Sequence, residues 1–83
     1  MNFKAIVTVM PQKEILDPQG KAVEHALQQI GLKTVENVRI GKNIEFNLEA
    51  DSETQALETV KNASKSLLAN MIMEDFKIEL KKY

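Results

Sequence analysis

The sequence predicts an α+β domain in which two helices cover one face of a four-stranded antiparallel sheet. Apolar residues alternate with period two in four segments and recur at helical spacing in two others, in the order β-α-β-β-α-β. Each helix has only one apolar stripe, so each helix needs an apolar sheet face to cover. The expected arrangement is the ferredoxin-like split βαβ fold, with the first strand in the sheet interior beside the last strand.

The first strand is expected over residues 3–10, because β-branched residues dominate there and Pro11 ends the ladder of hydrogen bonds. Its buried face consists of Phe3, Ala5, Val7 and Val9. The opposite face carries Ile6 and Met10, so it is only half polar. A strand with apolar residues on both faces is usually central or covered by a partner. We therefore expect Ile6 and Met10 to lie in a dimer interface.

The first helix is expected at about 18–30, after a loop over residues 11–16. Asp17 can cap the helix, and Pro18 suits its first position. Gly31 provides a left-handed end. The apolar stripe is formed by Val23, Ala26, Leu27 and Ile30. The only histidine, His25, lies off this stripe, which favours a surface position.

Two strands around a tight turn are expected over residues 34–50. Val38 and Ile40 share one face of the first strand, and Gly41-Lys42-Asn43 form the turn. The second strand then places Ile44, Phe46 and Leu48 on its buried face.

The second helix is expected at about 53–69. Ser52, with Gln55 three residues later, forms a capping box at its start, and Asn70 can end the helix. The last strand is expected over residues 75–82, with alternating apolar and charged positions.

Composition limits the function. The 83 residues allow a single domain over residues 1–83, and 11 basic against 12 acidic residues argue against a nucleic-acid or anionic-membrane binder. The absence of cysteine excludes disulfides, thiol catalysis and Cys-based metal sites, and one histidine cannot form a multi-His site. We expect no cofactor and no metal. No targeting signal or membrane-length apolar run is visible, so a cytoplasmic location is expected.

No catalytic set can be assembled from the remaining polar residues. Arg39-x-Gly41-Lys42 could hold a phosphate through a turn and two cations, or it could be an exposed basic hairpin. The carboxylates of Glu74 and Asp75 are more typical of a solvated turn than of an acid/base pair, which would need burial. Residues 71–73, Met-Ile-Met, either cover the end of the core or form an adaptable contact surface.

Three stretches together resemble one family, the PurS subunits of phosphoribosylformylglycinamidine synthase. They are residues 16–23 (Leu-Asp-Pro-Gln-Gly-Lys-Ala-Val), residues 38–45 (Val-Arg-Ile-Gly-Lys-Asn-Ile-Glu) and residues 67–76 (Leu-Leu-Ala-Asn-Met-Ile-Met-Glu-Asp-Phe). The resemblance covers nearly the whole chain in the right order. It departs at Met71, where the family often has proline or another small residue.

The resemblance implies a role in de novo purine biosynthesis. The enzyme of this family is a ligase that uses ATP and glutamine to convert formylglycinamide ribonucleotide into formylglycinamidine ribonucleotide. A PurL subunit carries the synthetase chemistry and a PurQ subunit releases ammonia from glutamine. PurS is implied to be a homodimer without catalytic residues that joins the other two subunits.

Contacts with PurL and PurQ are expected where the resemblance is concentrated. The candidate residues are Asp17, Pro18, Gln19, Gly20, Arg39, Gly41, Lys42, Asn70, Glu74 and Asp75. An alternative function with the same order of strands and helices is an ACT-type regulatory domain that binds an amino acid at a dimer interface.

Overall fold

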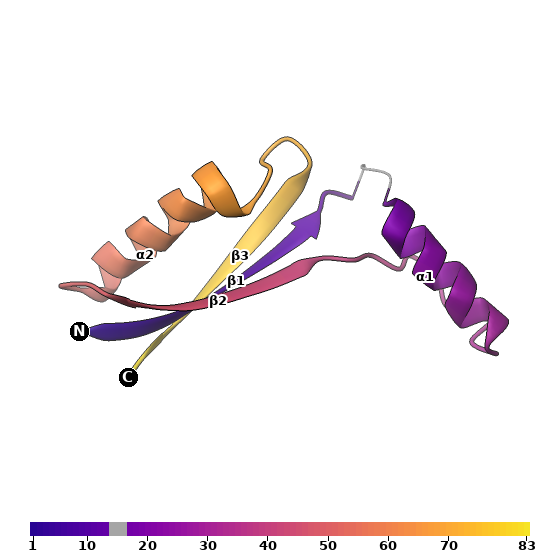
Figure 1. Cartoon of the computed structure of the whole chain (residues 1–83), viewed down its shortest axis with the longest axis horizontal. Coiled ribbons are helices and arrows are strands. Elements are labelled where there is room, and N and C mark those ends of the chain that lie inside the picture. The colour runs from indigo at the N-terminus through magenta and orange to yellow at the C-terminus, as the bar shows by residue number, and fades with distance from the viewer. Residues whose placement is uncertain (14–16) are drawn as a thin grey trace.

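A computed structural model describes residues 1–13 and 17–83. It contains β1 (Asn2–Pro11), α1 (Pro18–Gln29), β2 (Lys42–Glu49), α2 (Glu53–Ala63) and β3 (Glu74–Lys82), and a π-helical turn, η1 (Ser64–Leu68), extends α2 (Figure 1). Residues 14–16, which include part of the expected loop and the first residue of the Leu-Asp-Pro stretch, lie outside the described residues. No helix among the described residues is long and apolar enough to cross a membrane.

The sheet is antiparallel, with strand order β2-β1-β3. The expected central position of the first strand, beside the last, is therefore confirmed. Ala5 lies opposite Phe46 on one side and Leu80 on the other. The predicted alternation of β1 is also confirmed, because Phe3, Ala5, Val7 and Val9 are all at most 1% exposed.

Helix α2 covers the apolar face of β1 and β3 (Figure 1). Ala56 and Val60 are fully buried on it. The predicted Ser52 cap is confirmed, because the Gln55 backbone N–H donates to the Ser52 hydroxyl at 3.1 Å. At the other end, the buried Ser64 hydroxyl donates to the Val60 carbonyl at 2.8 Å, so this polar group keeps a partner inside the core.

The prediction of a four-stranded sheet is wrong: the described residues form three strands. Residues 34–41 lead into β2 without a strand partner among the described residues, and the tight turn expected at residues 41–43 is absent. The reason lies at Gly41, where a Cβ atom would collide with the Met10 side chain and the Val9 carbonyl. Gly41 is thus required by close approach to β1, and the chain continues straight past Met10 instead of turning back.

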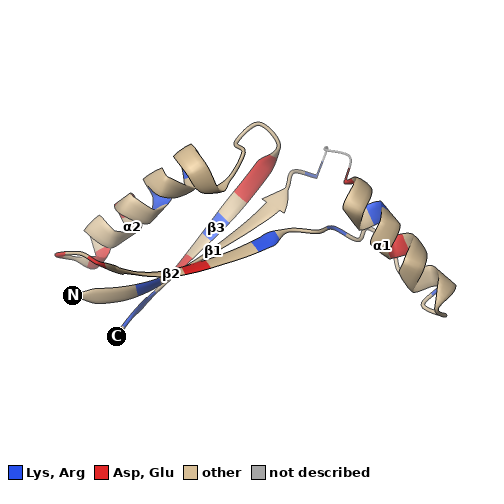
Figure 2. Cartoon of the chain, in the orientation of Figure 1, with Lys and Arg blue, Asp and Glu red and all other residues tan. Residues whose placement is uncertain are grey.

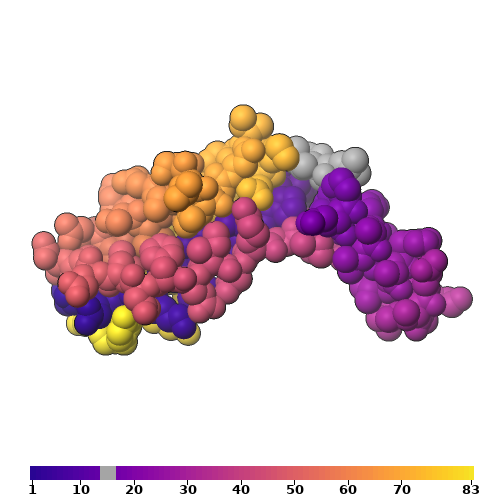
Figure 3. Space-filling model, in the orientation of Figure 1, coloured from indigo at the N-terminus to yellow at the C-terminus, as the bar shows by residue number. Residues whose placement is uncertain are grey.

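The prediction that both helices cover the sheet is also wrong, because the chain does not turn back at Gly41. Helix α1 and the segment that leads to β2 form an arm, residues 17–41, that projects from the sheet (Figures 1 and 3). The molecule measures 50 × 27 × 14 Å, and its radius of gyration is 16.3 Å. A compact domain of this length would have a radius of gyration of about 12 Å.

Candidate functional site

Asp17 joins the two parts of the arm. Its Oδ1 accepts the backbone N–H of Gly20 at 3.0 Å, which is the predicted helix cap, and its Oδ2 accepts the backbone N–H of Ile40 at 2.9 Å. Pro18 occupies the first turn, as predicted. The hydrogen bonds from Ile40 and then Gly20 lower the pKa of Asp17 below its ordinary value of 3.8. The carboxylate therefore links helix α1 to residues 34–41 in its charged form.

One polar face of α1 binds residues 34–41, the returning segment of the arm. Gly20 is buried, and a Cβ atom there would collide with the Val38 carbonyl. One turn further on, Glu24 Oε1 accepts the Val38 backbone N–H at 3.2 Å. After another turn, the Gln28 side chain donates to the Val35 carbonyl at 3.0 Å. Two of the three stretches that carry the family resemblance thus meet inside the arm.

The apolar stripe of α1 is therefore not the face that binds this segment. Val23 is 38% exposed and Ile30 is 76% exposed, while Leu27 is half-buried. Sequence reasoning missed Glu24 and Gln28. Glu24 and Gln28 follow Gly20 at successive intervals of four residues, and this spacing is the signal that could have revealed a second contact face on this helix.

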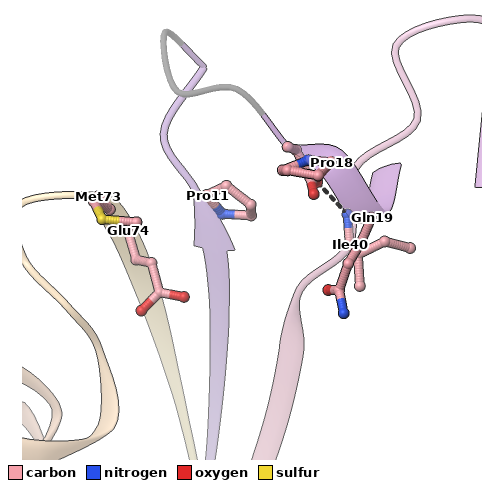
Figure 4. A pocket seen from close by; sticks show the side chains of 7 residues that line it. Pro11, Pro18, Gln19, Ile40, Met73 and Glu74 are labelled. Carbon is pink, nitrogen blue, oxygen red and sulfur yellow. Dashed lines mark hydrogen bonds between the residues drawn. The ribbon is translucent and has the colours of Figure 1, made fainter. Parts of the chain in front are cut away.

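A cleft of about 280 Å³ lies where the arm meets the sheet. Its wall is formed by the end of β1, the start of α1 with its cap residue, the returning segment of the arm, and the start of β3 with the residue before it (Figure 4). The lining residues are Pro11, Asp17, Pro18, Gln19, Ile40, Met73 and Glu74. The cleft therefore brings together four of the predicted contact residues, from the first and third resembling stretches.

The loop before β3 is closed by its own polar groups. Glu74 Oε1 accepts the Asn70 backbone N–H at 2.8 Å, and the Glu74 backbone N–H donates to the Asn70 carbonyl at 2.7 Å. Lys42 lies beside this loop, with its Nζ 3.4 Å from the Leu68 carbonyl and 4.0 Å from a Glu74 carboxylate oxygen. Met71 and Met73 are both close to half exposed, so these thioethers do not fill the core.

The remaining predicted residues are more scattered. Arg39 is half-buried and lines a separate hollow of about 360 Å³ with Lys13 and Asn37. Asp75 is exposed on β3, opposite Met10. His25 lies on the exposed side of α1, as predicted. Within residues 1–13 and 17–83, no three acidic or histidine side chains gather as metal ligands would.

Ile6 and Met10 lie on the sheet face opposite α2, and both are half-buried. Ile6 is flanked across the strands by Glu45 and Glu79. Glu45 forms an ion pair with Lys4 at 3.1 Å, and this partner is the main cause of the lowered pKa of Glu45. Figure 2 shows that charged residues of both signs are distributed along the strands. The place of Ile6 and Met10 in a dimer interface stays a prediction.

Comparison with known proteins gives a consistent result. Residues 4–82 match the family model described as PurS, phosphoribosylformylglycinamidine (FGAM) synthase. The chain is 40% identical over 79 residues to the PurS subunit of that synthase from Bacillus subtilis, with 94% of this chain and 92% of the relative covered. A PurS subunit from Methanocaldococcus jannaschii is 32% identical over 80 residues, with 96% of each chain covered.

Solved structures agree with these relatives. Thermus thermophilus PurS has a TM-score of 0.85 and 40% identity, and all of this chain and 99% of that chain are covered. A chain in the structure of PurLQS from Thermotoga maritima has a TM-score of 0.89 and 30% identity, with 98% and 99% covered. This chain therefore belongs to the PurS family, the small subunits of phosphoribosylformylglycinamidine synthase.

Proposed function

We propose that this chain is a non-catalytic assembly subunit, which joins the PurL synthetase and the PurQ glutaminase of its own organism. The observation that carries the proposal is the match over 98% of this chain to a chain in the Thermotoga maritima PurLQS structure. The synthase makes formylglycinamidine ribonucleotide in the cytoplasm from formylglycinamide ribonucleotide, ATP and glutamine. The comparisons support this function, and none of them supports the ACT-type alternative.

The physical benefit of assembly comes from the nitrogen donor. Ammonia released into water at neutral pH is protonated and loses its nucleophilic lone pair. Holding the two active sites close together replaces a dilute encounter in solution with a directed transfer. An assembly subunit needs surfaces for this task rather than reactive groups.

We propose that the contact surface is centred on the cleft between the arm and the sheet. The proposed contact residues are Asp17, Pro18, Gln19, Gly20, Arg39, Gly41, Lys42, Asn70, Glu74 and Asp75. Many of them are tied into the arm or the loop before β3, so the fold fixes the shape of this surface before any partner binds. We also propose that Ile6 and Met10, on the opposite sheet face, contribute to self-association as a homodimer.

The experiment compares two nitrogen donors. Formation of formylglycinamidine ribonucleotide is measured with cognate PurL and PurQ, with and without this chain, using glutamine or a high concentration of ammonium. Omission of this chain should abolish the glutamine reaction and should affect the ammonium reaction far less, because added ammonia bypasses the transfer. Full glutamine-dependent activity without this chain would contradict the proposal.

A further inference from the structure

The hollow lined by Lys13, Asn37 and Arg39 is basic. Lys13 follows β1, whereas Asn37 and Arg39 belong to the returning segment of the arm, so two distant parts of the chain bring two cations to one place. No acidic side chain lines this hollow within residues 1–13 and 17–83. The hollow also shares no lining residue with the cleft between the arm and the sheet.

Neither cation of the hollow is neutralised by an ion pair in the described part of the chain. The ion pairs found there use other lysines, namely Lys4, Lys21, Lys42 and Lys81. Asp17 is near enough to sense the charge of Arg39. However, its lowered pKa comes mainly from the backbone N–H groups of Ile40 and then Gly20, which occupy both carboxylate oxygens, and Arg39 contributes least. The hollow therefore keeps an excess of positive charge.

Arg39 is held in position by the residues on either side of it. The Val38 backbone N–H donates to Glu24 at 3.2 Å, and the Ile40 backbone N–H donates to Asp17 at 2.9 Å. The Arg39 side chain is half-buried, so its charge acts in a less screened environment than that of a fully exposed arginine. None of the hydrogen bonds described for residues 1–13 and 17–83 uses its guanidinium group. Its N–H donors are thus placed before any ligand binds.

We propose that this hollow binds the phosphate group of a small phosphate monoester. Two cations match the charge of about −1.5 to −2 that such a group carries at pH 7, whereas a carboxylate carries only one charge. The planar guanidinium of Arg39 suits two phosphate oxygens at once, and the ammonium of Lys13 adds a point charge. The side-chain amide of Asn37, a residue in the left-handed conformation with φ of 59°, provides a neutral donor.

The volume of the hollow limits the organic part of the ester. At about 360 Å³ it lies near the lower end of the range for small-molecule sites, which is about 300–1,000 Å³. A bare phosphate ion would leave much of this space empty, and a pentose attached to the phosphate would fill more of it. The inference concerns this chain alone and does not rest on its proposed role in assembly.

The test is a titration of this chain alone with ribose 5-phosphate at low ionic strength, followed by NMR of the backbone amides. The signals of residue 13 and of residues 37–39 should shift. Inorganic phosphate should shift the same signals with weaker affinity, and ribose, which lacks the phosphate, should shift none of them. Added salt should weaken the binding, because it screens the charges.

Variants connect the binding to the two cations. Lys13→Ala should weaken binding of ribose 5-phosphate about tenfold or more, which is typical for the loss of a hydrogen bond to a charged group. Lys13 is exposed, and no hydrogen bond or ion pair described for residues 1–13 and 17–83 uses its side chain, so this variant should fold. Arg39→Ala should weaken binding further. The matched control is Lys61→Ala, which removes the same charge from the exposed side of α2 and should leave the affinity unchanged.

Four results would overturn the proposal. They are the absence of binding at millimolar ribose 5-phosphate, shifts confined to other residues, equal losses of affinity in Lys13→Ala and Lys61→Ala, and inorganic phosphate bound as tightly as the ester. Tighter binding of a short glutamate peptide than of ribose 5-phosphate would also overturn it, because the hollow would then belong to a carboxylate-bearing protein partner.

Discussion

Gly20→Ala tests whether helix α1 packs against the returning segment of the arm in solution or merely precedes a loop. Alanine in the first turns of a helix ordinarily stabilises a protein by up to about 1 kcal/mol relative to glycine. Here the new Cβ atom would collide with the Val38 carbonyl and would lie 2.7 Å from Asp17 Oδ2. Both neighbours are held, since Asp17 and residue 38 are hydrogen-bonded across the arm.

Relief of the collision requires the returning segment to move by about 1 Å, and overpacking of this kind typically costs about 1–3 kcal/mol. The gain in helix propensity offsets part of this cost, so the net loss should be about 1–2 kcal/mol. With an m-value of about 2 kcal/mol/M in urea, the midpoint of unfolding should fall by about 0.5–1 M. Circular dichroism at one fixed protein concentration measures this, because a dimer unfolds in a concentration-dependent way.

Gln19→Ala is the control, because Gln19 is exposed and lies in the same helical turn. Its urea midpoint should stay close to that of the parent. At an ordinary helix position, replacing glycine with alanine would raise the midpoint. If Gly20→Ala did so here, the contact between α1 and Val38 would not exist in solution, and the described packing of the arm would be wrong.

Three further predictions concern pH, the core and the outer sheet face. Because the pKa of Asp17 is lowered in the folded state, its charged carboxylate stabilises the fold above the unfolded pKa near 3.8, and this contribution is lost as the pH falls through the folded pKa. The difference in melting temperature between the parent and Asp17→Asn should therefore shrink between about pH 5 and pH 3. A difference that stays constant with pH would contradict the role of the charge. Val60→Ala removes two methyl groups from a fully buried position and should cost about 1–3 kcal/mol by urea unfolding, whereas exposed Lys61→Ala should cost far less. Ile6→Glu places a third carboxylate between Glu45 and Glu79 and should weaken any association through that face, and an unchanged mass in light scattering across dilution would remove Ile6 from the interface.

The part of the fold that contains the sheet and α2 is predicted well from the sequence, because its signals are local. Period-two alternation in β1 and the Ser52 cap each depend on residues close together in the chain, and both are confirmed. The arm could not be predicted in the same way. A stripe such as that of Val23 and Ile30 shows that a helix face needs cover, but it does not say which surface provides it.

Gly41 shows the limit most clearly. In the local sequence it suggests a turn, since glycine next to lysine and asparagine is typical of one. In the structure, the need for glycine comes from Met10, a residue 31 positions earlier that lies beside it across the sheet. Contacts of that kind depend on strand register, which the pattern of one short segment does not determine.

Several of the proposed contact residues also hold the fold together, and this determines how the assembly proposal can be tested by mutation. Asp17 and Gly20 hold the arm together, and Glu74 closes the loop before β3, so a loss of synthase activity in their variants would mix a folding defect with a binding defect. Gln19 and Asp75 are exposed, and none of the hydrogen bonds or ion pairs described for residues 1–13 and 17–83 uses their side chains. Because the fold does not depend on these two side chains, they are the positions at which the proposed contact with PurL or PurQ can be tested while the fold is left intact.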